Sequence, residues 1–273
     1  MEICRVVIDG QPESRIEMTL RDARMAVVRR HGFTLYDLLI SVFVMGLLMA
    51  ILLPTLGQAY ETAKRVQCAS NQRQIGLALH MYADNYGGVL PPTVFGMSPN
   101  LWDQDPQEMV YLRLDHHPRV GDQVAWDGLG FLLDLEYLTH PGVFYCPSHR
   151  SFHTFEDHKD EFRTGRGSIA GNFLYRFDAR VREGYLSDLP SDTALLADSF
   201  RSQPDYNHRV GMNSVLADGS VHWFGDPGQR LYNVVPYSES SPTSRTIVKR
   251  MWGWLDVGHI PTIIDFVPVP PEN

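Results

Sequence analysis

The sequence predicts an α+β protein in which one long N-terminal helix packs on an antiparallel β-sheet. The first observation is an apolar run that starts at Phe33 and continues into a helical pattern ending near Asp84. The second is a change after Gly87 to short segments rich in β-branched and aromatic residues, separated by turn-forming residues. A helix followed by a run of strands is typical of a sheet covered by that helix.

The composition excludes several classes of protein. Hydrophobic residues make up 44% of the 273 residues, which suffices for a buried core and argues against a disordered chain. The formal net charge of −8 describes an acidic exterior that repels phosphate backbones, so we expect no nucleic-acid partner. The sequence contains no Gly-x-Ser-x-Gly, no phosphate-binding loop and no His-Glu-x-x-His, so we expect no enzyme.

Residues 33–53 have the length and composition of a membrane-spanning helix. At a rise of about 1.5 Å per residue they cover about 30 Å, the thickness of the hydrocarbon layer. Residues 38–53 contain no charged side chain. Because Arg24, Arg29 and Arg30 precede the run, the positive-inside rule predicts a single pass with the N-terminus cytoplasmic and the C-terminal domain outside.

The helical pattern continues beyond the apolar run, which predicts one helix over residues 33–86, interrupted at Pro54. A secretory signal peptide cleaved after Ala59 is the alternative, and it leaves this continuation unexplained. On other faces of the helix we expect five polar residues: Glu61, Lys64, Arg65, Gln72 and Arg73. The predicted apolar stripe consists of Ala63, Val66, Ser70, Ile75, Ala78, Leu79 and Tyr82.

The stretch GFTLYDLLISVFVMGLLMAILLP resembles the N-terminus of type IV prepilins and type II secretion pseudopilins. The matching positions are Gly32, Phe33 with the following Thr-Leu, the acid Asp37, and Pro54. The resemblance implies cleavage between Gly32 and Phe33 by a prepilin peptidase and methylation of the new Phe33 amine. It also implies an anchor in the inner, cytoplasmic membrane and a domain that faces the periplasm.

Cleavage would explain Asp37, since a charge inside a bilayer helix costs about 2.5–3.5 kcal/mol on insertion scales. The new α-amine of Phe33 lies one helical turn away, and the carboxylate of Asp37 can offset it. In the resembling families this acid is usually Glu and is thought to recruit the next subunit. The partners implied are therefore the peptidase, other pilins or pseudopilins that contact the helix, and membrane lipid.

The leader, residues 1–32, is longer than the leaders of the resembling families. A start at Met25 would leave the short basic leader MAVVRRHG. The expected organisation is thus a leader over 1–32, a helix over 33–86 and an exported β-rich domain over 87–273.

Five segments of the exported domain have strand composition. In the hairpin SVLADGSVHW we expect Asp218 and Gly219 to supply the positive φ angles of a type I′ turn. The segment TALLADSF echoes the first arm of this hairpin and is expected beside it. The strand candidates are residues 142–148, 168–177, 193–200, 213–224 and 262–269.

A second resemblance covers much of this domain. Residues 68–92, 145–148, 168–172 and 207–224 are similar to a large, functionally uncharacterised bacterial family that carries prepilin-type N-termini. Its marker is His-x9-Asp-Gly, which corresponds here to His208, Asp218 and Gly219. His208 and Asp218 would either hold a metal together or serve separately, Asp218 in the turn and His208 in packing or a buried hydrogen bond.

Cysteines and histidines leave further alternatives open. Cys4 lies in the leader, so Cys68 and Cys146 would remain as either a disulfide or two unrelated buried thiols. Zinc-type ligands occur within thirteen residues at Cys146, His149, His153 and His158, without the spacing of a known zinc motif. Calcium would find oxygen-rich turns at Asp103, Asp105, Asp122, Asp127 and Asp226, without the spacing of a calcium loop, so no cofactor is expected.

These patterns favour a pseudopilin-like structural subunit, assembled into a type II secretion or type IV pilus-like structure. The alternative is a membrane-anchored or secreted binding module that uses the prepilin leader for export and does not polymerise.

Overall fold

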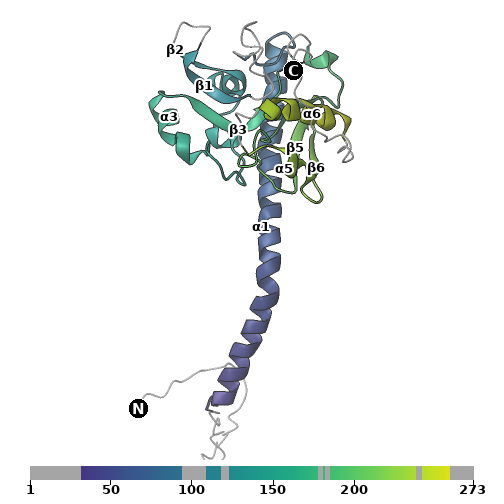
Figure 1. The fold of residues 1–273 in the computed structure, drawn as a ribbon. Helices are drawn as coiled ribbons and strands as arrows, with labels where there is room; N and C mark the ends of the chain where they lie inside the picture. Colours follow the sequence, from purple (N-terminus) through teal and green to yellow (C-terminus); the bar gives the residue numbers. More distant parts are fainter. Residues whose placement is uncertain are drawn as a thin grey trace, which may run out of the picture. The chain divides into compact units, whose positions relative to one another are not determined.

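The predicted N-terminal helix is confirmed: in a computed structural model of the protein, α1 spans Leu35–Asn85 (Figure 1). The structure describes residues 32–93, 109–117, 123–177, 181, 185–237 and 242–258. The helix stops at Gly87 and Gly88, whose φ angles of 69° and 89° no helix can continue. The Gly88 amide donates to the Ala83 carbonyl at 2.7 Å and thereby closes the last turn.

The chain forms two compact units, residues 1–53 and 54–273. In the described part of the first unit the side chains of α1 are exposed, apart from the half-buried Ser41. By length and composition α1 contains a segment able to cross a membrane, and no residue of that segment is buried within the protein. This matches the membrane-spanning segment expected from the sequence.

The predicted antiparallel sheet is also confirmed, and all its pairings lie in the second unit (Figure 1). Its strand order in the described part of the chain is β2-β1-β3-β4-β5-β6. The strands are β1 Met109–His117, β2 Gln123–Trp126, β3 Ile169–Tyr175, β4 Ala194–Asp198, β5 Gly211–Leu216 and β6 Val221–Gly225.

Short helical segments connect the strands, and one longer helix follows them. The longer helix, α6, spans Pro242–Val257. The short segments are η3 Gly128–Gly130, α2 Phe131–Asp134, η4 Pro141–Phe144, η5 Glu156–His158, α3 Lys159–Thr164, η6 Leu186–Asp188 and α5 Arg230–Val234.

Two hydrophobic cores lie on the two faces of the sheet. In β3, Phe173 packs in the core that contains Ile75 and Leu79 of α1. The next residue, Leu174, packs in the core that contains Trp252 of α6. Since successive strand residues point to opposite faces, α1 covers one face and α6 the other. Burial on both faces explains why β3, β4 and β5 are buried along their whole length.

Three of the predicted strand segments are confirmed, at β3, β4 and the β5–β6 hairpin, and β4 pairs with β5 as expected. The prediction for residues 142–148 is wrong, because Pro141 starts the 3₁₀ turn η4 and a further turn follows it. Residues 262–269 lie outside the described part of the chain. Sequence reasoning missed β1, β2 and α6. In β1 the alternation of Val110, Leu112 and Leu114 with Tyr111, Arg113 and Asp115 was a signal that could have identified the strand.

The buried stripe of α1 differs from the predicted one in its first half. Ile75 and Leu79 are buried as expected, but Ala63 and Val66 are exposed. Their place is taken by polar residues such as Gln72, which is 0% exposed. The pattern failed here because this part of the helix faces a polar cluster instead of an apolar core.

The turn of the hairpin differs in type from the prediction. Gly219 has a φ of 80°, whereas Asp218 is not among the residues with positive φ. The Gly219 amide donates to the Leu216 carbonyl, and the Leu216 amide donates to the Ser220 carbonyl, both at 2.9 Å. This is the pattern of a three-residue loop, a turn closed by a left-handed glycine, instead of a two-residue type I′ turn.

The contact between α1 and the sheet predicts a steric effect at Gly76. A Cβ atom added there would lie 2.7 Å from Cγ1 of Val215 in β5, while one added at Gly57 of the same helix meets nothing within 4 Å. We expect Gly76→Val to lower the free energy of unfolding by about 1–3 kcal/mol through overpacking. Gly57→Val should change the free energy of unfolding by less than about 0.5 kcal/mol, because this substitution alters helix propensity in the same way without the clash. Denaturant unfolding of the full chain in detergent tests this, and equal effects of the two changes would contradict it.

Candidate functional site

The start of α1 brings Thr34 and Asp37 together. Oδ2 of Asp37 accepts hydrogen bonds from the amide of Thr34 at 3.0 Å and from its hydroxyl at 2.7 Å. The amide of Asp37 donates to the Thr34 hydroxyl at 3.2 Å. This reciprocal pair is a capping box, which fixes the first residue of the helix. Gly32 and Phe33 precede the helix and are exposed, as a cleavage position requires.

A second candidate site is a buried group of four side chains, here named the thiol cluster: Cys68, Cys146, Asp198 and His208. Cys68 lies on α1, Cys146 follows η4, Asp198 ends β4, and His208 precedes β5. Their exposed fractions are 0%, 4%, 0% and 0%. The sulfur atoms, a carboxylate oxygen and a ring nitrogen all lie within 4.8 Å of one another.

The contacts within the cluster are short and specific. Sγ of Cys68 donates to Oδ1 of Asp198 at 2.8 Å. Sγ of Cys146 lies 3.3 Å from Nε2 of His208, and the same nitrogen lies 3.8 Å from Oδ2 of Asp198. The other ring nitrogen of His208, Nδ1, lies 2.9 Å from Oε1 of Glu61 on α1. The imidazole therefore presents Nε2 to the thiols and Nδ1 to a carboxylate.

Donors from three elements surround the carboxylate of Asp198. Oδ1 accepts from the side-chain amides of Gln72 at 2.9 Å and Asn207 at 3.3 Å. Oδ2 accepts from the backbone amide of Asn213 at 2.7 Å and from its side chain at 3.3 Å. A buried carboxylate is tolerated only when it is hydrogen-bonded in this way. The network thus fixes the position of Asp198 between α1 and the sheet.

Burial, hydrogen bonds and neighbouring charges shift the pKa values of three side chains in the cluster. Burial by itself would lower the pKa of His208, but the hydrogen bond to Cys146, the charges of Asp198 and Cys146 and the bond to Glu61 raise it to about 9. Burial, the hydrogen bond to Cys146 and the charge of Asp198 raise the pKa of Cys68. Burial opposes ionisation of Cys146 too, yet its bonds to Cys68 and His208 lower its pKa. Cys146 is therefore the thiol that gives up its proton more readily.

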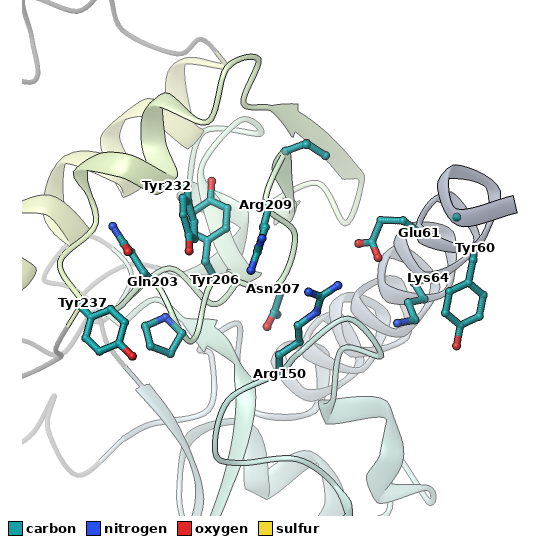
Figure 2. Close-up of a pocket in the computed structure, with 13 residues that line it drawn as sticks. Tyr60, Glu61, Lys64, Arg150, Gln203, Tyr206, Asn207, Arg209, Tyr232 and Tyr237 are labelled. Atoms are coloured by element: carbon teal, nitrogen blue, oxygen red, sulfur yellow. The ribbon is translucent and has the colours of Figure 1, made fainter. Parts of the chain in front are cut away.

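A pocket of 530 Å³ is lined in part by Glu61, whose carboxylate contacts His208 of the cluster. Figure 2 shows Glu61 and Lys64 on α1 on one side of the pocket and Arg150 and Arg209 on the other. Glu61 also accepts a hydrogen bond from the Ser148 hydroxyl at 3.0 Å. A cysteine beside a histidine can act as a nucleophile, but the burial of both side chains separates them from any substrate in this pocket.

The two polar residues of the predicted His-x9-Asp-Gly marker lie in separate places. His208 belongs to the thiol cluster, whereas Asp218 is exposed in the hairpin turn, where its Oδ1 accepts from the amide of Ser220 at 2.8 Å. Gly219 supplies the positive φ angle of that turn. Of the alternatives left open by the sequence, separate roles for His208 and Asp218 are therefore correct, and a shared metal is wrong.

The histidines near Cys146 do not join it in a metal site. His149 instead contacts Oδ1 of Asn207 at 2.6 Å and the Phe152 carbonyl at 2.7 Å. His153 and His158 stack on each other with ring centroids 5.9 Å apart. The partners of Cys146 are Cys68, Asp198 and His208, which sequence reasoning did not combine, because residues this far apart share no local spacing.

Cys68 and Cys146 are neighbours and free thiols in the structure. A disulfide between them would need the two sulfur atoms about 2.05 Å apart.

Of the acidic turns considered for calcium, Asp127 is buried. Asp226 accepts hydrogen bonds from the amides of Leu231 and Tyr232, both at 3.1 Å, and so caps α5. Asp103, Asp105 and Asp122 lie outside the described residues.

The network around Asp198 predicts a cost for removing a donor. Gln72→Leu should lower the free energy of unfolding by about 1.5–3 kcal/mol, because it removes a hydrogen bond to a buried charge. Gln74→Leu on the exposed face of the same helix is the matched control and should change it by less than about 0.5 kcal/mol. Thermal or denaturant unfolding of the full chain measures both, and a neutral Gln72→Leu would contradict the role of this contact.

Comparison with known proteins identifies the family. Residues 57–194 match the model of a family described as "Protein of unknown function (DUF1559)". No curated protein and no solved structure matches the chain. The match includes Cys68 and Cys146, but it does not reach Gly32 or His208. Since it spans half of the chain, the protein belongs to this family of unknown function.

Proposed function

We propose that the protein is a pilin-like structural subunit, anchored in the cytoplasmic membrane by the first half of α1. A prepilin peptidase removes the leader after Gly32, and the domain from Pro54 onward faces the outside of that membrane. The exposed apolar part of α1 then packs against lipid or against the same helices of other subunits. In this proposal the protein acts through assembly and contact, and no catalytic residue is assigned.

The observation that supports this proposal most strongly is the exposure of an apolar helix. The membrane-length segment of α1 is entirely unburied. Its exposed side chains include Leu38, Phe43 and Leu48, which lie on three different faces of the helix at about 100° per residue. A helix that is apolar all round is unstable in water and needs lipid or neighbouring helices as its surroundings. A pilin-like subunit would meet both, lipid in the membrane and neighbouring helices in an assembly.

The position of Asp37 supports the same proposal. The capping box keeps its carboxylate in the first turn of the helix, one turn from Phe33. After cleavage the new amine of Phe33 would be the nearest cation in the same chain, and the pair would reduce the cost of placing a charge at the membrane.

One observation favours the alternative, a membrane-anchored binding module that does not polymerise. Asp37 accepts two hydrogen bonds from Thr34 of its own chain, so its carboxylate is already engaged before any neighbour arrives. The pocket with Lys64, Arg150 and Arg209 would then be the surface through which the module acts.

Processing is tested at the mature N-terminus. In membranes from cells with an active prepilin peptidase we expect a chain that begins at methylated Phe33, and in cells without the enzyme the leader should remain. Gly32→Val should abolish cleavage, whereas Gly46→Val, a control of equal size in the exposed apolar helix, should not. Mass spectrometry of the intact protein measures both, and a mature chain beginning at Tyr60 would disprove the proposal.

Assembly is tested by separating the charge of Asp37 from its capping role. Asp37→Asn keeps an acceptor for the cap but removes the charge, while Thr34→Val removes the hydroxyl of the cap and keeps the charge. If subunits assemble through the charge, cross-linking between α1 helices in intact membranes should fall at least tenfold in Asp37→Asn and by less than twofold in Thr34→Val. Absence of cross-links in the unchanged protein, despite cleavage, would favour the module that does not polymerise.

A further inference from the structure

We propose that the thiol cluster, Cys68, Cys146, Asp198 and His208, binds one Zn²⁺ ion as a closed structural site. The site would join α1 to the sheet. This inference goes beyond the proposed function and does not depend on cleavage or assembly.

The chemistry of the donors selects the metal. Two sulfur atoms, one imidazole nitrogen and one carboxylate oxygen converge within 4.8 Å. Zinc binds these three ligand types, and in structural sites it takes four of them in a tetrahedron. Calcium and magnesium prefer oxygen ligands alone, so two thiolates argue against them.

The distances between donors agree with a tetrahedral site. With ordinary zinc–ligand bonds, the edges of such a tetrahedron are about 3.3–3.8 Å long. The Cys146 sulfur lies 3.3 Å from Nε2 of His208, and this nitrogen lies 3.8 Å from Oδ2 of Asp198. Cys68 approaches the other oxygen of the same carboxylate, Oδ1, and this shorter distance of 2.8 Å is a hydrogen bond made by the thiol proton. Loss of that proton on zinc binding would remove the hydrogen bond and leave the sulfur atom free to bind the metal.

The surroundings of the cluster have the features of an outer coordination shell. Histidine ligands of metals usually donate their other ring nitrogen to a carboxylate, and Nδ1 of His208 lies 2.9 Å from Oε1 of Glu61. This contact directs Nε2 toward the thiols. Carboxylate ligands are likewise held by hydrogen bonds, as Asp198 is held by Gln72 and Asn213.

The burial of the cluster assigns the ion a structural role. No more than 4% of any of the four residues is exposed, so no coordination position faces a substrate. The ligands come from α1, the loop after η4, the end of β4 and the loop before β5. An ion held by all four would cross-link segments up to 140 residues apart, which is how structural zinc stabilises a fold.

Zinc binding would release protons from the ligands and leave all oxidation states unchanged. The Cys68 thiol releases one proton, and the proton held between Cys146 and Nε2 of His208 is released as well, while Nδ1 keeps its proton toward Glu61. Two thiolates, one neutral imidazole and one carboxylate then donate electron pairs to Zn²⁺. No electron is transferred, so no oxidant is required, in contrast to disulfide formation by the same two cysteines.

The experiment uses the full chain, purified from membranes in detergent without chelators. Elemental analysis should find one zinc ion per chain, and mass spectrometry under denaturing conditions should find both cysteines reduced. The double change Cys68→Ser with Cys146→Ser should lower the zinc content at least tenfold. His222→Ala, which alters an exposed histidine of the same domain, should leave it unchanged.

Two further measurements remain informative if the double change prevents folding. Replacement of zinc by Co²⁺ should produce thiolate-to-metal charge-transfer absorption in the unchanged protein. Glu61→Gln weakens the bond to His208 from a half-buried position and should lower zinc affinity about 10–100-fold in competition with a chelator. Lys64→Gln, on the same wall of the pocket, should change the affinity less than twofold.

Three results would overturn the inference. One is a chain that contains no zinc and takes up none from added Zn²⁺. Another is zinc content that persists in the double cysteine variant. The third is a Cys68–Cys146 disulfide in protein isolated from its own membrane, detected as a cross-linked peptide two mass units lighter than the reduced pair.

Discussion

The fold of the domain from Pro54 onward depends on a buried charge, the carboxylate of Asp198 at the end of β4. Placing a carboxylate out of water is costly unless donors surround it, and here they come from α1, from the loop before β5 and from β5 itself. The same carboxylate accepts from Cys68 and faces His208. The polar cluster therefore fixes which face of α1 meets the sheet, where an apolar stripe alone would allow it to slide or rotate.

A single helix serves two different surroundings. From Leu38 to Leu53 the side chains of α1 are almost all apolar and exposed, and such a surface is stable only against lipid or other helices. Farther along, the helix buries a stripe that begins with Cys68 and Gln72 and continues with Ile75 and Leu79 against the sheet. A metal ion bound by the thiol cluster would strengthen the contact at the point where it is polar.

Membership in a family of unknown function supplies no chemistry by itself, so the functional argument rests on the residues. The proposed pilin-like role is based on the exposed apolar helix and on the start of α1. The thiol cluster is consistent with that role, because it is closed to solvent and positions elements instead of presenting a reactive group. The pocket beside it, with cationic side chains on both walls, remains the surface best suited to contact an acidic partner.

The sequence by itself determined the helix, its membrane-length apolar half, the α+β class and the β4–β5–β6 pairing. Each of these depends on local periodicity or on a local turn signal, which one segment of chain carries alone. The tertiary structure decided the partners of Cys146, the burial of Gln72 and the second face of the sheet covered by α6. These depend on residues up to 140 positions apart, such as Cys68 and His208, and no local pattern specifies which of many polar residues will meet. The histidines nearest to Cys146 in sequence were the wrong partners, because the chain turns them toward Asn207 and toward each other.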